Sequence, residues 1–174
     1  MRAVDLAEQV PVVRRETTGA EAARVIAEYR LSGLVVADDQ DVPIAVIPGS
    51  QLLTLVLPQY VRDEPNLSHA YDEQGADELC RVLNKATVGE LLEAKKLTGH
   101  KPPSVLPNDT LLEAASAMDA GHTPVILVMD RGGTFFGVIT LSRLLAAIAT
   151  AAGQDSPLMR RRLARDVLHR EDNV

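Results

Sequence analysis

The 174-residue sequence predicts an α+β fold in which two tandem β-α-β-β-α repeats pack sheet to sheet into one pseudo-two-fold module. One observation is a gap-free internal match, in which the segment 13–56 falls on 105–148 when the chain is shifted by 92 residues. The other is the order of patterns in each copy, where a helical spacing of apolar residues precedes two short β-prone runs and a second helix. These observations together indicate a duplication.

Identical residues recur at equivalent positions in the two copies. The pairs include Thr18/Thr110, Glu21/Glu113, Ala22/Ala114, Val36/Val128, Asp38/Asp130, Ile47/Ile139, Ser50/Ser142 and Leu53/Leu145. Most of the remaining pairs keep apolar character, so the same core positions are expected in both copies.

Each copy begins with a short predicted strand, at 10–13 and at 103–106. The first helix then starts at a capping box, Thr18 to Glu21 or Thr110 to Glu113, in which the Thr hydroxyl and the Glu side chain satisfy free amides. Gly121 is expected to end the second copy's helix in a left-handed conformation.

Two β-prone runs joined by a polar turn follow the first helix in each copy. They span 34–37 and 44–47 in the first copy, and 125–129 and 135–139 in the second. Asp38 and Asp130 open the turns and are expected to stabilise them. The second helices, 50–56 and 142–152, are apolar over most of their surface, which predicts burial on both sides, partly in a homodimer.

The chain therefore divides into a first repeat (4–58), an acidic helical linker (59–102), a second repeat (103–152) and a basic C-terminal helix (153–174). Within the linker, helices are expected at 77–85 and 87–96. Ser156 is expected to cap a helix over 157–170, with Pro157 in its first turn. Its basic face could contact nucleic acid, an anionic membrane or the acidic linker, or lie in solvent.

Composition excludes several classes of function. The net charge of −6 and the aromatic content of 3% argue against a nucleic-acid partner. The single cysteine, Cys80, cannot form an intramolecular disulfide and is expected to be a buried, inert thiol. No signal peptide or membrane span is recognisable, so a cytoplasmic location is expected.

No catalytic or metal-binding motif is visible. The histidines, His69, His100, His122 and His169, share no metal-ligand spacing. The sequence contains no nucleophile triad, phosphate-binding loop or zinc motif. We therefore expect no catalytic residues, no metal site and no enzymatic activity.

The repeat unit, its Thr-x-x-Glu-Ala helix start, and the run from Gly137 to Thr140 resemble CBS domains. The run from Thr87 to Leu92 is similar to the lead-in helix of that family. The chain thus resembles a stand-alone CBS-domain pair, or Bateman module. The resemblance implies dimerisation into a flat disc. It also implies clefts for AMP, ATP or S-adenosylmethionine, recognised by a Gly-h-h-Thr/Ser-x-x-Asp motif, where h is apolar.

This sequence departs from that motif. Arg143 stands where the ribose-binding Asp is expected, and the first repeat reads Ala45, Pro48 and Gln51 at the three motif positions. The candidate ligand-binding residues are Thr140, Ser142, Arg143, Gly49, Ser50 and Gln51.

Arg143 falls in the first turn of a helix, where a cation is unfavourable by roughly 0.3–1 kcal/mol. A bound phosphate would compensate for this cost; alternatively, Arg143 points to solvent or pairs with an acid. Thr140 is expected to cap the same helix, with or without a ligand. Gly49 and Ser50 provide either a similar anion-binding helix start or a purely structural one.

The leading functional hypothesis is a regulatory module that senses an adenosine-type nucleotide, or another phosphate-bearing ligand, between the repeats. Because no catalytic domain is attached, it would act in trans, for example on a transporter or a metabolic enzyme. The alternative is a ligand-free dimerisation or interaction scaffold with decayed nucleotide sites.

Overall fold

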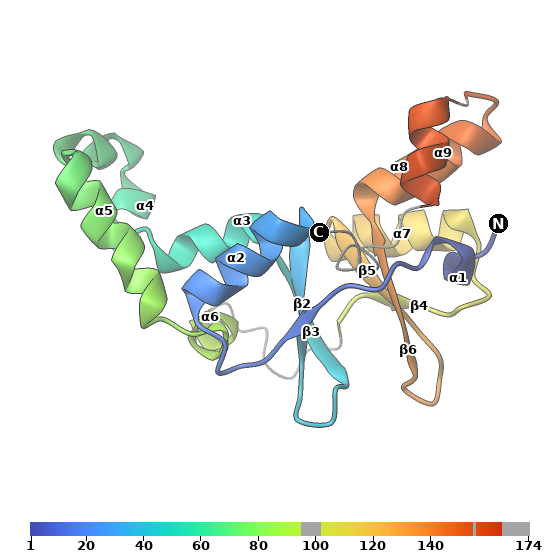
Figure 1. Cartoon of the computed structure of the whole chain (residues 1–174), viewed down its shortest axis with the longest axis horizontal. Helices are drawn as coiled ribbons and strands as arrows, with labels where there is room; N and C mark the ends of the chain where they lie inside the picture. Colours follow the sequence, from blue (N-terminus) through green and yellow to red (C-terminus); the bar gives the residue numbers. More distant parts are fainter. Residues whose placement is uncertain (95–101, 155, 165–174) are drawn as a thin grey trace, which may run out of the picture.

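The computed structural model describes residues 1–94, 102–154 and 156–164 and contains two three-stranded sheets with the same topology (Figure 1). In each sheet the first strand runs parallel to the second, and the second antiparallel to the third. The strands are β1 (Val12–Val13), β2 (Gly33–Ala37) and β3 (Pro43–Pro48) in one sheet, and β4 (Ser104–Val105), β5 (Val125–Met129) and β6 (Phe135–Thr140) in the other. The predicted duplication and α+β class are confirmed.

The duplication extends to the details of strand pairing. The register shifts between Val36 and Ala37 in the first sheet, and at the equivalent position in the second. The carboxylate of Asp38 then accepts two backbone amides at 2.9 Å, and that of Asp130 accepts two at 2.8 Å. Hydrogen bonds from Thr134, and then from Gly132, lower the pKa of Asp130 below its ordinary value. Both aspartates stabilise their turns, as expected.

The helices of each repeat follow the predicted order. They are α2 (Gly19–Tyr29) and α3 (Gly49–Leu52), which continues as the 3-10 turn η1 (Leu53–Leu55), and their counterparts α7 (Leu111–Gly121) and α8 (Leu141–Ala151). Thr110 forms the predicted capping box with Glu113. At Thr18 only half of the predicted box forms: its hydroxyl accepts the Glu21 amide, without the return bond to the Glu21 side chain. The amide and hydroxyl of Thr110 lower the pKa of Glu113.

The end of α7 differs from the prediction. The left-handed residue is His122, with φ of 45°, and Gly121 is the last helical residue. Arg30 occupies the same position after α2, with φ of 52°. Both helices therefore end with a non-glycine residue in a conformation that costs some backbone strain.

Two short helices are exchanged between the repeats. The helix α1 (Ala3–Leu6) lies at the N-terminal end of the first repeat, yet Ala3 and Leu6 are 0% and 1% exposed in the core of the second. The helix α6 (Val88–Ala94) precedes the second repeat, yet Val88, Leu91 and Leu92 are buried in the core of the first. The core of each repeat is thus completed by a helix that adjoins the other repeat in the sequence.

The two sheets pack face to face through an aliphatic layer. Its buried members are Val10, Val35, Val46, Val125, Leu127 and Val138. These residues come from both sheets and from the segment before β1, so this layer joins the repeats into one module. The predicted sheet-to-sheet packing is confirmed.

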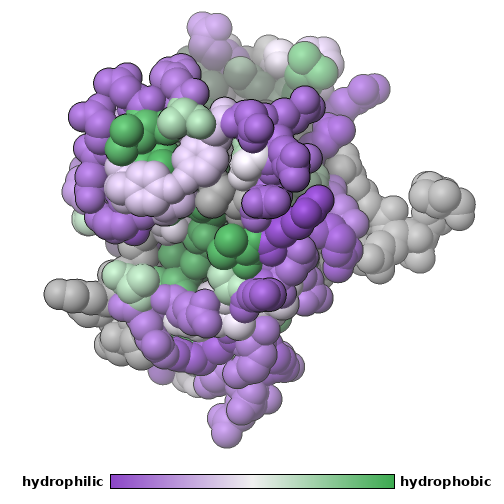
Figure 2. Space-filling model, turned by 90° about the vertical axis from the view of Figure 1, so that its left-hand side faces the viewer, coloured by the Kyte–Doolittle hydropathy of each residue, from purple (hydrophilic) through white to green (hydrophobic). Residues whose placement is uncertain are grey.

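The linker forms a helical arm that extends away from the sheets (Figure 1). Its elements are α4 (Gln59–Asp63), η2 (Pro65–Ala70), α5 (Glu73–Arg81) and η3 (Val82–Asn84). Figure 2, which views this end, shows largely hydrophilic side chains with apolar areas between them. Cys80 on α5 is exposed, so the prediction of a buried thiol is wrong: the arm packs against too little of the module to cover it.

The helix α9 (Pro157–Leu163) packs on α8, and Ser156 accepts the Met159 amide at its start, as predicted. The remainder of the predicted helix to residue 170 lies outside the described residues, as do residues 95 and 96 of the second linker helix. Among the described residues, no helix combines the length and apolar character needed to cross a membrane.

Because α1 completes the core of the second repeat, we expect its buried Leu6 to contribute as much to stability as a central core residue. Replacing Leu6 by Ala is expected to lower the free energy of unfolding by about 2–5 kcal/mol, because a cavity forms in the second repeat. Leu112→Ala, at a side chain that is 79% exposed, is the control and should change stability by less than about 0.5 kcal/mol. Urea unfolding measures both; equal small effects would show that α1 does not belong to that core.

Candidate functional site

The candidate site lies where β6 ends and α8 begins. Residues 7–10, which we call the N-terminal strap, run from α1 toward β1 along the edge of β6. The amide of Glu8 donates to the Val138 carbonyl and the Val138 amide donates to the Glu8 carbonyl, each at 2.9 Å. Gly137 has φ of +133°, and a Cβ there would lie 2.7 Å from the backbone carbonyl oxygen of Glu8. Glycine is therefore required where the strap approaches β6.

The strap places the Glu8 carboxylate between two of the predicted site residues. The Thr140 hydroxyl donates to Glu8 Oε1 at 3.2 Å, and Arg143 Nη1 lies 3.6 Å from Glu8 Oε2. The Arg143 and Glu8 side chains are only 7% and 9% exposed. The Ser142 hydroxyl lies 3.5 Å from that of Thr140. An arginine and a hydroxyl at the start of α8 thus already hold an anion supplied by the chain itself.

The structure shows how Thr140 and Arg143 are engaged within the chain itself. Thr140 is the N-cap residue of α8, as predicted, but its side chain makes no capping hydrogen bond; its hydroxyl donates to Glu8. Arg143 was expected to bind a phosphate, to point to solvent or to pair with an acid; in the structure it pairs with Glu8. The sequence pattern did not single out Glu8, because it lies more than 130 residues away and outside the repeat alignment.

The equivalent position in the first repeat is uncharged. The Gly49 amide donates to the Ser32 carbonyl at 2.9 Å, which reproduces the hydrogen bond from Leu141 to Pro124 in the second repeat. Ser50 is exposed, and Gln51 is half-buried with its Oε1 atom buried and without a hydrogen-bond partner. The backbone of the site is duplicated, whereas its charge is confined to the second repeat.

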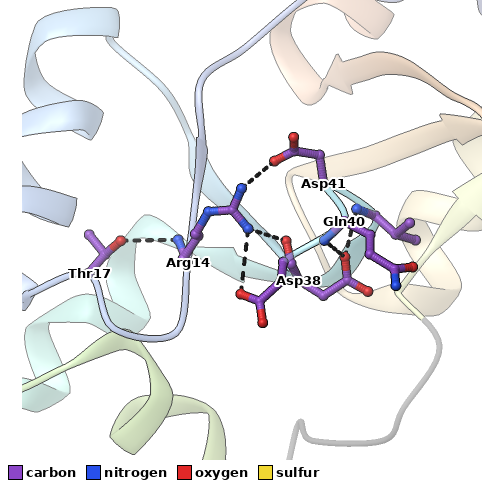
Figure 3. A network of polar contacts seen from close by, with 7 residues as sticks. Arg14, Thr17, Asp38, Gln40 and Asp41 are labelled. Atoms are coloured by element: carbon purple, nitrogen blue, oxygen red, sulfur yellow. Dashed lines mark hydrogen bonds and ion pairs between the residues drawn. The ribbon is translucent and has the colours of Figure 1, made fainter.

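A second polar network distinguishes the repeats at the opposite end of the strands (Figure 3). The Arg14 guanidinium donates to the Asp38 carbonyl and to the Asp41 carboxylate, the latter at 2.7 Å. The Thr17 hydroxyl accepts the Arg14 amide at 3.0 Å. The sequence alone did not single out this network. The Arg14 and Asp41 side chains are 41% and 71% exposed, so the pair is expected to contribute only about 0–1 kcal/mol to stability.

In the second repeat, leucine and glycine occupy the positions of Arg14 and Asp41, and that network is absent there. A pocket of about 470 Å³ remains, with Asp109, Asp130 and Arg131 in its wall. The Asp109 carboxylate accepts the Leu106 amide at 2.7 Å, so it is engaged in its own turn.

Within the described residues, no group of three or more His, Cys, Asp or Glu side chains is placed to hold a metal ion. His122 is exposed at the end of α7, and His69 is exposed in the arm. His100 and His169 lie outside the described residues.

The outer faces of the second helices are uncovered. Leu145 and Ile148 of α8 are 54% and 39% exposed and, with Met118 of α7, line a groove of about 390 Å³. Leu53, equivalent to Leu145 in the first repeat, is 58% exposed. The prediction that these helices are buried on both sides is therefore not met within one chain, since packing against the sheet covers only the inner face.

The buried pair between Glu8 and Arg143 yields a double-mutant prediction. Arg143→Met or Glu8→Leu alone is expected to cost about 3–5 kcal/mol of unfolding free energy, because each removes the oppositely charged partner of a buried group. The double variant should recover most of that loss. Chemical denaturation of all four proteins measures the coupling, and strictly additive effects would contradict a buried ion pair.

Comparisons with known proteins agree with this architecture. Residues 3–57 and 94–150 match the family model of the CBS domain. A CBS domain-containing protein of unknown function from Kribbella flavida DSM 17836 has 35% sequence identity; the match covers 86% of this chain and 99% of that chain, with a TM-score of 0.67.

CBSX2, a CBS-pair protein from Arabidopsis thaliana, is 20% identical over 89% of this chain and 98% of its own, with a TM-score of 0.64. CBSX2 in complex with AMP matches with 20% identity over 87% of this chain and 98% of that one, at a TM-score of 0.59. No curated protein sequence matches the chain. The matched family model, the 35% identical relative and the paired sheets lead to one conclusion: this chain belongs to the CBS-domain family, and it carries two CBS repeats.

Proposed function

We propose that the protein is a non-catalytic regulatory module of the cytoplasm that binds an adenosine-type nucleotide, or another phosphate-bearing ligand, in its second repeat. The observation that carries this proposal is the anion already held at the start of α8. Thr140 and Arg143 converge on the Glu8 carboxylate, in a buried place where helix amides also favour negative charge. A ligand phosphate has the charge and the acceptor atoms that this place accommodates.

The nucleotide class is proposed from relatives and from the family motif. The structure of CBSX2 with AMP makes AMP the first ligand to test, followed by ATP and S-adenosylmethionine. Since Arg143 replaces the usual Asp, we assign it to the phosphate, with Thr140 and Ser142 as hydroxyl partners. The first-repeat residues Gly49, Ser50 and Gln51 form the weaker candidate site, because no charged side chain stands at any of these positions.

Nucleotide titration tests this function. AMP at a hundredfold excess over its Kd would stabilise the folded protein by about 2.7 kcal/mol, seen as a rise in Tm. Arg143→Ala is expected to abolish the binding measured by calorimetry. Thr140→Val, which removes only the hydroxyl, should weaken binding and serves if Arg143→Ala does not fold. The absence of any response to AMP, ATP and S-adenosylmethionine would refute nucleotide sensing.

A homodimer is the second part of the proposal. The uncovered leucines of α8 and η1 are pseudo-equivalent, so a second copy can cover both repeats with one kind of contact. If no ligand binds, these faces favour the alternative function, a ligand-free dimerisation or interaction scaffold. In either case the module would act in trans on a separate protein, such as a transporter or a metabolic enzyme.

Leu145→Glu tests the dimer. Placing a charge in the apolar groove of α8 is expected to convert the dimer to a monomer in light scattering coupled to gel filtration, because burying it without a partner is costly. Leu112→Glu, at an exposed leucine that does not line the groove, is the matched control and should leave the mass unchanged. A monomeric wild-type protein at micromolar concentration would contradict the proposal.

A further inference from the structure

We propose that Glu8 is an internal competitor for the anion site, and that a phosphate-bearing ligand binds by displacing its carboxylate from Arg143 and releasing the N-terminal strap. This inference rests on the proposed function and adds its regulation. It assigns to Glu8 a role that neither the repeat pattern nor the family motif contains.

Glu8 occupies the place that a phosphate-bearing ligand would take. Its two oxygens contact the Thr140 hydroxyl and the Arg143 guanidinium, the same donors that a phosphate would use. Because these side chains are nearly fully buried, an incoming anion cannot reach them while the carboxylate remains in place. Ligand binding and the observed position of Glu8 are therefore mutually exclusive.

A phosphate can replace the Glu8 carboxylate as the anion beside Arg143. The ion pair between Arg143 Nη1 and Glu8 Oε2 measures 3.6 Å. A phosphate presents three acceptor oxygens and can engage the guanidinium through two parallel hydrogen bonds. Exchanging one anion for another also keeps the buried charge of Arg143 compensated, which avoids the large penalty of leaving it alone.

The N-terminal strap lies between the anion site and the contact between the two sheets. Besides the paired hydrogen bonds with Val138, the strap is attached by Gln9, whose Nε2 donates to the Phe136 carbonyl at 2.8 Å. Two residues after Glu8, Val10 is buried in the aliphatic layer between the sheets. Displacing Glu8 thus disturbs a segment that connects the ligand site to the contact between the repeats, which gives the module a route for passing on the binding signal.

Glu8→Gln tests the competition directly, because it removes the charge and keeps the shape. Calorimetric titration with AMP, and separately with inorganic phosphate, is expected to give at least about fivefold tighter binding than wild type, the lower range of allosteric couplings. Glu93→Gln is the matched control. Glu93 pairs with Arg15 at 2.8 Å, is 67% exposed and lies away from the site. The affinity of this variant for AMP and for phosphate should equal that of the wild type.

The outcomes separate the two proposals. If wild type binds AMP and Glu8→Gln binds it equally or more weakly, the competition is overturned. Nucleotide sensing would remain intact, with Glu8 as a structural or ligand-contacting residue. Absence of binding of both AMP and inorganic phosphate, by wild type and by Glu8→Gln, would overturn both proposals. Phosphate binding without AMP binding, tightened in Glu8→Gln, would support the competition and restrict the ligand to simple phosphates.

Hydrogen exchange on the wild-type protein gives a second measurement that does not depend on a variant folding. The amides of Glu8 and Val138 are hydrogen-bonded to each other's carbonyls. Saturating AMP is expected to accelerate exchange at both amides, because the strap is released, while core amides of β5 stay protected. Slower or unchanged exchange at Glu8 and Val138 in the AMP-bound protein would contradict displacement.

Discussion

The exchange of α1 and α6 between the repeats is the constraint on which the rest of the structure depends. Neither sheet covers its helices alone: Leu6 closes the core of the second repeat, and Leu91 closes that of the first. Because α1 and α6 each pack in the core of the other repeat, neither repeat can complete its core unless the two lie side by side. The aliphatic layer between the sheets then adds apolar burial to a topology that the crossings already require.

The exchange of α1 also explains why Glu8 lies in the candidate site. To reach β1 from α1, the strap has to pass along β6, and this path carries Glu8 past the start of α8. Gly137 permits that approach, whereas the equivalent residue of the first repeat is Ala45. The pairing of Glu8 with Arg143 is therefore a consequence of topology as much as of the local motif. It also explains how a cation is tolerated in the first turn of a helix.

Local features of the fold could be predicted from the sequence, because short-range chemistry determines them. The Thr caps, the aspartate turns and the alternation of strands and helices depend on residues a few positions apart, and duplication made each signal visible twice. Features that depend on distant contacts could not be predicted. The hydroxyl of Thr140 donates to Glu8 instead of capping, the repeat that α1 completes is set by packing, and Cys80 is exposed because the arm extends from the module.

The first repeat retains the backbone of the site without its charge, and the second lacks the network around Arg14. The two repeats thus share the path of the main chain and differ in the side chains at both ends of the strands. Because the two repeats form one unit, the chain is expected to unfold in one cooperative event. Differential scanning calorimetry on the whole chain measures this most directly: the calorimetric and van't Hoff enthalpies should agree. Two separate transitions, one for each repeat, would contradict the account.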